Sequence, residues 1–226
     1  FFNRPRHGAL HAYDLHTGGL TTLVELDGML PIHPDASPTD PGLVKFSHDN
    51  YDAHCQRIWT VRVDGTGLTA IRPQEWNELI THEFWWPDGQ CIGFKYQDRR
   101  HDPTVMSLPW AEYAPSPTRF GLAALDGTQA YLSDPLESYH SHIFVSGDGT
   151  LLTGEGTHDH SCVYVARFRR DTPWVDFIPH ATIHTPCLPL AGQKVNAGMT
   201  ADNRWVVYND TIDGVSQVCA VRVEVD

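Results

Sequence analysis

The stretch Thr81-His82-Glu83-Phe84-Trp85-Trp86-Pro87-Asp88-Gly89 is the clearest of four copies of one layout along this 226-residue chain. In each copy a polar residue precedes a turn aspartate by six or seven positions, and a short apolar segment follows the turn. The four pairs are His33 with Asp40, His82 with Asp88, His142 with Asp148, and Asn196 with Asp202. Successive aspartates are 48, 60 and 54 residues apart. A repeat of this length, built from several short strands, predicts an all-β fold of the β-propeller type.

The repeat also predicts where the four polar residues lie. In a radially repeated fold, equivalent positions of consecutive sheets form a ring around the axis. We therefore expect the imidazoles of His33, His82 and His142 and the amide of Asn196 to converge near that axis.

Strand and turn signals fill in the remaining elements. The chain opens with a hairpin of residues 9–15 and 20–26, three fuller units follow, and the last unit stops one strand short. Further strands are expected at residues 31–35, 43–47, 57–63, 68–71, 91–94, 119–125, 151–152, 162–168, 205–208 and 216–225. We expect a surface loop over 97–117, and an edge strand with a crossover loop within 171–192. The prediction is one domain over 1–226, with about four to five blades and little helix.

Composition excludes several classes of partner. A formal net charge of −12, from 16 Lys and Arg against 28 Asp and Glu, argues against nucleic acid and anionic membranes. The five cysteines form no Cys-x-x-Cys pair, which predicts neither a disulfide framework nor a zinc site. No apolar run has membrane-spanning length, and the first residues lack the layout of a signal peptide. We expect a cytoplasmic protein, whose oligomeric state the sequence leaves open.

Several single residues have both a structural and a functional interpretation. His33 could tie neighbouring blades by a hydrogen bond or serve an axial site, because imidazole can act as a base or bind a divalent metal. Arg57 could meet an acidic ligand as a two-pronged donor, whereas its repeat counterpart Arg119 also fits a role in blade packing. The His158-Asp159-His160 triplet lies in a polar loop and is interpreted as solvated rather than as a metal site.

The motifs together resemble the oligogalacturonate lyases, the pectin-degrading polysaccharide lyase family 22. The most specific element is the stretch from Thr81 to Gly89 with Arg57 upstream of it. Other matching stretches are Ile32-His33-Pro34, Ser37-Pro38-Thr39-Asp40-Pro41, Val44-Lys45-Phe46-Ser47-His48-Asp49, Gln56-Arg57-Ile58-Trp59, Ser141-His142, Asp148-Gly149 and Gly192-Gln193. Members of this family are seven-bladed propellers, so the chain resembles their later blades, and their first blades are absent from it.

The resemblance implies a lyase that cleaves oligogalacturonides, or a related oligouronide, by β-elimination. By resemblance, His82 is the base that takes the C5 proton, and Arg57 neutralises the adjacent carboxylate. Proton removal beside an ionised carboxylate builds further negative charge, so a cation aimed there favours the reaction. We expect His33, His48 and Arg119 to contact the substrate, a small acidic oligosaccharide.

The resemblance also implies a manganese ion, with His142, Gln193 and Asn196 as its ligands in this chain. Two metal-binding histidines of the family fall at Asn196 and Gly198. An Asn carbonyl can coordinate a hard cation, whereas Gly198 supplies no side chain. The sequence therefore predicts an incomplete manganese site.

The same departure favours an alternative from another functional class. A non-catalytic β-propeller with a degenerate metal site would bind a sugar or a protein through its axial funnel. The paired motif at Arg57 and His82 favours the enzyme. We take the lyase as the leading hypothesis and keep the binding propeller as its rival.

Overall fold

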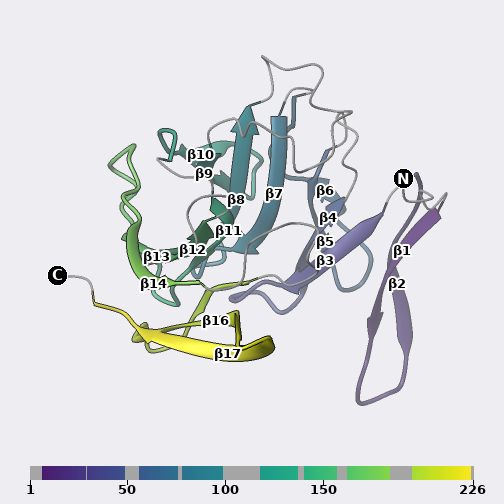
Figure 1. The fold of residues 1–226 in the computed structure, drawn as a ribbon. Helices are drawn as coiled ribbons and strands as arrows, with labels where there is room; N and C mark the ends of the chain where they lie inside the picture. Colours follow the sequence, from purple (N-terminus) through teal and green to yellow (C-terminus); the bar gives the residue numbers. More distant parts are fainter. Residues whose placement is uncertain are drawn as a thin grey trace.

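The computed structural model describes residues 7–28, 30–48, 56–75, 78–98, 118–136, 140–156, 162–183 and 195–224. All regular secondary structure in these ranges is β-strand. Seventeen strands form five antiparallel sheets, each made of strands that are consecutive in sequence. Figure 1 shows the sheets following one another as the blades of a propeller. The described ranges contain no helix with the length and hydrophobicity needed to cross a membrane.

The sheets are numbered in chain order. Sheet 1 pairs β1 (His7–Tyr13) with β2 (Leu20–Asp27). Sheet 2 contains β3 (Pro31–Ala36), β4 (Leu43–His48), β5 (Ile58–Arg62) and β6 (Thr69–Ala70). Sheet 3 contains β7 (Glu78–Trp85), β8 (Cys91–Asp98), β9 (Thr118–Ala124) and β10 (Gln129–Leu132). Sheet 4 contains β11 (His140–Val145), β12 (Leu151–Gly156), β13 (Cys162–Arg167) and β14 (Ile178–Thr182). Sheet 5 contains β15 (Gly198–Met199), β16 (Trp205–Ile212) and β17 (Val215–Arg222).

The all-β propeller predicted from the repeat is confirmed, including the opening hairpin and the three-stranded last sheet. The first two strands of sheet 3 are longer than predicted. Strand β7 begins at Glu78, and β8 extends to Asp98, which pairs with Glu78. Within this extension Lys95 and Gln97 are buried, at 2% and 4% exposure. The prediction that Gln97 begins a surface loop is therefore wrong. The rest of that expected loop, the crossover over 184–192, and the triplet at 158–160 lie outside the described residues.

Apolar packing holds consecutive sheets together at each of their four junctions. Sheets 1 and 2 bury a cluster of Leu10, Leu23, Val24, Phe46 and Val61. Sheets 2 and 3 share a cluster that includes Ile58, Ile71, Ile80, Trp85, Ile92 and Phe94. The junction of sheets 3 and 4 includes Phe84, Phe120, Ile143, Leu152 and Phe168. Sheets 4 and 5 meet through Leu151, Val163, Val165, Val195 and Val206. These clusters fix the relative positions of the inner strands.

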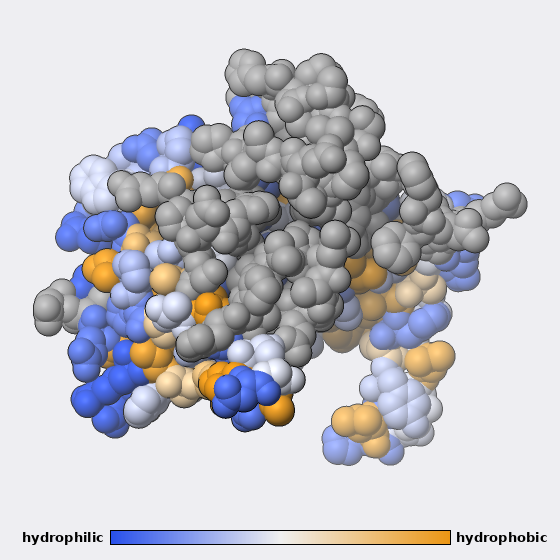
Figure 2. Space-filling model, in the orientation of Figure 1, coloured by the Kyte–Doolittle hydropathy of each residue, from blue (hydrophilic) through white to orange (hydrophobic). Residues whose placement is uncertain are grey.

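The hairpin of sheet 1 projects from the other sheets at the lower right of Figure 1. In Figure 2 the same projection carries hydrophobic residues beside hydrophilic ones. Its exposed apolar side chains include Tyr13, Leu15 and Leu20. The hairpin packs against sheet 2 through Leu10, Leu23 and Val24, with Ala12 partly buried beside them.

The four repeated aspartates make the same turn. In each turn, one carboxylate oxygen accepts a hydrogen bond from the backbone N–H two residues later. The donor–acceptor distances are 2.8 Å for Gly42 to Asp40, 2.8 Å for Gln90 to Asp88, 3.0 Å for Thr150 to Asp148 and 3.1 Å for Arg204 to Asp202. Aspartate favours such turns because its short side chain can replace a backbone acceptor. The sequence repeat therefore reflects a repeated turn geometry.

Asp148 is the turn aspartate whose carboxylate should make stability depend on pH. The hydroxyl and N–H of Thr150 and the hydroxyl of Ser146 donate to this carboxylate and lower its pKa to about 2. Because the folded pKa lies below the unfolded value, the carboxylate stabilises the fold at neutral pH, and this contribution is lost as pH falls through about 4 toward about 2. We expect Asp148→Asn to lower the urea midpoint at pH 7 and to have a smaller effect at pH 3. An equal effect at both pH values would contradict this assignment.

Candidate functional site

A left-handed residue stands at the repeated polar position of three sheets, within β3 and β7 and two residues before β15. The φ angles are 52° at His33, 57° at His82 and 47° at Asn196. In β3 and β7 the strand register shifts at this point, which identifies a β-bulge. Left-handed residues other than Gly cost about 1–3 kcal/mol and are concentrated at functional sites. The repeat therefore specifies an unusual backbone conformation as well as a polar side chain.

His142 occupies the corresponding position in sheet 4, where the register also shifts, between His140 and Ile143. The side chain of His142 is buried, and its ring contacts the ring of His82 in sheet 3. The ring centroids are 4.2 Å apart and the ring planes are inclined by 49°. The structure thus brings together two of the four predicted residues across the junction of sheets 3 and 4.

Glu155 in β12 lies behind His142 and is only 1% exposed. One of its carboxylate oxygens contacts Nδ1 of His142, and the other accepts a hydrogen bond of 3.2 Å from the N–H of Ala197. Ala197 directly follows the left-handed Asn196. One carboxylate therefore joins His142 to the segment that leads into the next sheet.

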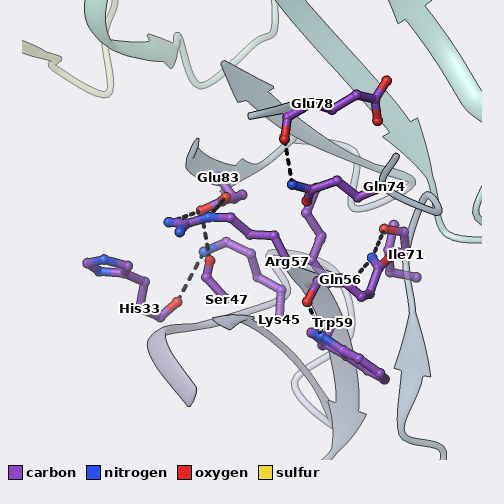
Figure 3. Close-up of polar contacts among 11 residues, drawn as sticks. His33, Lys45, Ser47, Gln56, Arg57, Trp59, Ile71, Gln74, Glu78 and Glu83 are labelled. Atoms are coloured by element: carbon purple, nitrogen blue, oxygen red, sulfur yellow. Dashed lines mark hydrogen bonds and ion pairs between the residues drawn. The ribbon is translucent and has the colours of Figure 1, made fainter. Parts of the chain in front are cut away.

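A second buried carboxylate, Glu83, follows the left-handed His82. It forms an ion pair with Arg57 of sheet 2 and accepts a 2.7 Å hydrogen bond from the Ser47 hydroxyl. These residues meet at the junction of sheets 2 and 3 in Figure 3. Burial raises the pKa of Glu83, but the charge and hydrogen bonds of Arg57, with the Ser47 hydroxyl, outweigh this and hold the pKa below its ordinary value.

Lys45 adds a second buried cation to this cluster. Its ammonium group donates to the carbonyl oxygen of His33 at 3.3 Å and lies 3.7 Å from the carboxylate of Asp35, as Figure 3 shows for His33. Burial lowers the pKa of Lys45, and the nearby carboxylates of Asp35 and Glu83 partly offset this. Two buried cations, Lys45 and Arg57, therefore face one buried carboxylate beside His33 and His82.

Ser47 and Glu155 occupy equivalent positions and make equivalent contacts with the next sheet. Ser47 and Glu155 are both the fifth residue of the second strand in their sheets. Each side chain reaches the residue that follows the left-handed position of the next sheet, namely Glu83 for Ser47 and Ala197 for Glu155. The residues that follow the left-handed positions thus carry a polar link between sheets at two of the junctions, beside the apolar clusters.

The remaining predicted residues have different environments. His48 is buried at the end of β4, and its N–H donates to the carbonyl of Arg57. Arg119 donates to the carbonyl of Ser133 at 2.7 Å, within its own sheet. Gln193 lies outside the described residues. The roles predicted for His82, Arg57, His33, His48 and Arg119 in catalysis or substrate binding stay predictions.

The described residues do not make up a manganese centre. Of the expected ligands, they include only His142 and Asn196. Nδ1 of His142 contacts Glu155, and Gly198 has no side chain. Within the described ranges no group of three or more His, Cys, Asp or Glu residues could hold a metal ion. The available donors do not fit the group, so no chemical step is assigned to a metal.

Comparison with known sequences identifies relatives of one kind. No family model matches the sequence. The chain is 30% identical to the oligogalacturonide lyase of Pectobacterium atrosepticum over 145 residues, and 28% identical to the oligogalacturonate lyase of Dickeya dadantii over the same length. These matches cover 64% and 63% of this chain but 33% of each relative. The chain therefore matches about a third of the length of these curated relatives.

The fold is also similar to that of an oligogalacturonate lyase solved in complex with manganese. The TM-score is 0.73 at 21% sequence identity, and the match covers 94% of this chain and 53% of the solved one. Sequence and fold thus confirm the resemblance that the motifs predicted. The partial coverage agrees with a match to only some of the blades.

The buried pair of Arg57 and Glu83 should contribute strongly to stability, because their side chains are only 8% and 1% exposed. We expect Glu83→Leu to lower the free energy of unfolding by about 3–5 kcal/mol, since it leaves the Arg57 guanidinium buried without its counter-ion. Urea unfolding measures this change.

The double variant Arg57→Met with Glu83→Leu is the matched control. It removes both charges, so it should be more stable than Glu83→Leu alone. If Glu83→Leu costs less than about 1 kcal/mol, the value typical of an exposed ion pair, the pair does not hold the junction of sheets 2 and 3.

Proposed function

We propose that this chain is part of a lyase that cleaves oligogalacturonides, or a related oligouronide, by β-elimination. The observation that carries the proposal is the contact between the rings of His82 and His142, beside a cluster with two buried cations. An imidazole has a pKa near neutrality and can take a proton at physiological pH. The relatives that the chain matches are themselves lyases of this kind.

In the proposed reaction, His82 takes the proton from C5, next to the substrate carboxylate. The electron pair of that bond forms a carbon–carbon double bond, and the bond to the leaving sugar oxygen breaks. That oxygen takes up a proton from water, and His82 afterwards returns its proton to water. Negative charge on the carboxylate side increases as the proton leaves, so nearby cations lower the barrier. The products are two shorter chains, one with an unsaturated uronate end.

The charge of the cluster supports an acidic substrate in a protein whose overall charge is negative. Lys45 and Arg57 in their charged forms exceed the single charge of Glu83, and Asp35 is half exposed and screened by water. We propose that Arg57 serves the substrate carboxylate while Glu83 holds its guanidinium in place. His33, His48 and Arg119 are proposed to contact the sugar chain, and a cytoplasmic location is proposed for the enzyme.

A second candidate function is a non-catalytic propeller that binds an acidic sugar at the same site. Gly198 favours it, because this residue replaces a metal ligand implied by the family resemblance. Calorimetry with oligogalacturonates distinguishes the two candidates. Binding without an unsaturated product supports the second, and cleavage excludes it.

The assignment of the base is tested by His82→Ala. With oligogalacturonates as substrate, the ultraviolet absorbance of the unsaturated product reports turnover. We expect the variant to lose about 10²–10⁴-fold in kcat, the contribution of a positioned base. His180→Ala is the control, because His180 lies in β14 and its ring bonds to the carbonyls of Ile178 and Glu224. A His82→Ala variant with unchanged kcat would exclude His82 as the base.

Manganese dependence is tested by restoring two histidines. A Cβ added at Gly198 would meet no atom within 4 Å, so the backbone leaves open space where a side chain would begin. Asn196→His places a His in the left-handed conformation that His33 and His82 already adopt. His142, Gln193 and Asn196 are the ligands that the family resemblance leaves in this chain, and we expect the double variant to bind Mn²⁺ at least about 10-fold more tightly than the wild-type protein. Electron paramagnetic resonance of free Mn²⁺ measures binding. Equal affinity of both proteins would refute this assignment of the metal ligands.

A further inference from the structure

We propose that Glu155 is a positioning residue whose single carboxylate sets the protonated nitrogen of His142 and anchors the segment that leads into sheet 5. The inference starts from burial. Glu155 is 1% exposed, and a buried carboxylate is stable only where donors satisfy it. Its two oxygens meet Nδ1 of His142 and the N–H of Ala197.

The chemistry of these partners fixes the proton on His142. An ionised carboxylate only accepts hydrogen bonds, and the backbone N–H of Ala197 only donates. The contact with His142 is therefore satisfied when Nδ1 carries a proton. Nε2 then remains as the nitrogen that can exchange a proton or bind a ligand.

The repeat shows that this position of the second strand does not itself need a carboxylate. At the equivalent position in sheet 2, the Ser47 hydroxyl makes the link to the following sheet. There the carboxylate belongs to the partner, Glu83. Glu155 differs in having a second oxygen, and that oxygen is the one that contacts His142. The carboxylate thus has a role beyond joining sheets 4 and 5.

The orientation of His142 matters because its ring stands 4.2 Å from that of His82, centroid to centroid. A carboxylate on Nδ1 restrains rotation of the ring, as it does for imidazoles in metal sites and catalytic triads. Glu155 therefore acts on His82 through His142. This catalytic part of the inference rests on the proposed lyase function, whereas the position of the proton does not.

Nitrogen NMR of protein labelled with ¹⁵N-histidine tests the proton position directly. The His142 signals are assigned by their loss in His142→Gln. We expect Nδ1 to be protonated in the wild-type protein. In Glu155→Gln the side-chain oxygen keeps the Ala197 N–H and the NH₂ group donates to Nδ1, so the proton should move to Nε2.

Glu78→Gln is the matched control. Glu78 is a largely buried carboxylate in β7 that binds both terminal nitrogens of Arg72, at 2.7 and 2.8 Å. We expect this variant to leave the His142 signals unchanged. An unprotonated Nδ1 in the wild-type protein, or the same protonated nitrogen in the wild type and Glu155→Gln, would overturn the proposal. The wild-type spectrum is decisive even if Glu155→Gln does not fold.

Kinetics test the catalytic part separately. We expect Glu155→Gln to lower kcat about 10–100-fold with little change in KM, and Glu78→Gln to retain the wild-type kcat. A shifted proton with an unchanged kcat would overturn the link from Glu155 to catalysis. If the wild-type protein cleaves no oligouronide, the proposed function fails while the NMR result still decides the role of Glu155.

Discussion

The left-handed backbone at one position of the inner strand is the constraint on which the site depends. It recurs at His33, His82 and Asn196, and in β3 and β7 it coincides with a bulge that inserts an extra residue into the strand. The residue after it then contacts the preceding sheet, as Glu83 does with Arg57 and Ala197 with Glu155. Polar groups are thereby introduced into junctions that are otherwise filled by aliphatic and aromatic side chains. Asn and His tolerate this conformation better than β-branched residues, which accounts for part of the repeat.

Equivalent positions nevertheless have different partners, and neighbouring residues decide which. Arg57 and Arg119 occupy the same place in consecutive sheets. In sheet 2 the side chain of Gln56 binds the carbonyl of Ile71, while Arg57 reaches Glu83 of the next sheet. In sheet 3 Arg119 itself binds the equivalent carbonyl, that of Ser133. Gln56 beside Arg57, and the acidic Glu83 where the next sheet has Ile143, therefore distinguish an arginine at the candidate site from one that supports its own sheet.

The sequence predicted the sheets well and the buried polar groups poorly, for a physical reason. Turn aspartates such as Asp148 and alternating apolar residues act over a few positions, so their pattern is visible along the chain. A charged residue in a strand ordinarily indicates the solvent face, so the sequence pattern predicts no buried role for Lys45, Glu83 or Glu155. The partners of Glu83 and Glu155 in neighbouring sheets lie 26 to 42 residues away, and His142, in the same sheet as Glu155, lies 13 residues away. Strands β8 and β12 are longer than the apolar pattern predicts, and each carries a buried charged residue in its second half, Lys95 and Glu155.

The link from Glu155 to Ala197 has a consequence for the order of folding. Each sheet is made of consecutive strands, so its hydrogen bonds can form early and locally as the chain is synthesised. Glu155 and His142 belong to sheet 4, but the second donor to the carboxylate arrives only with the strands of sheet 5. Until then the carboxylate retains contact with water at an open junction. The site around His142 is therefore completed late, when sheet 5 docks on a scaffold that has already formed.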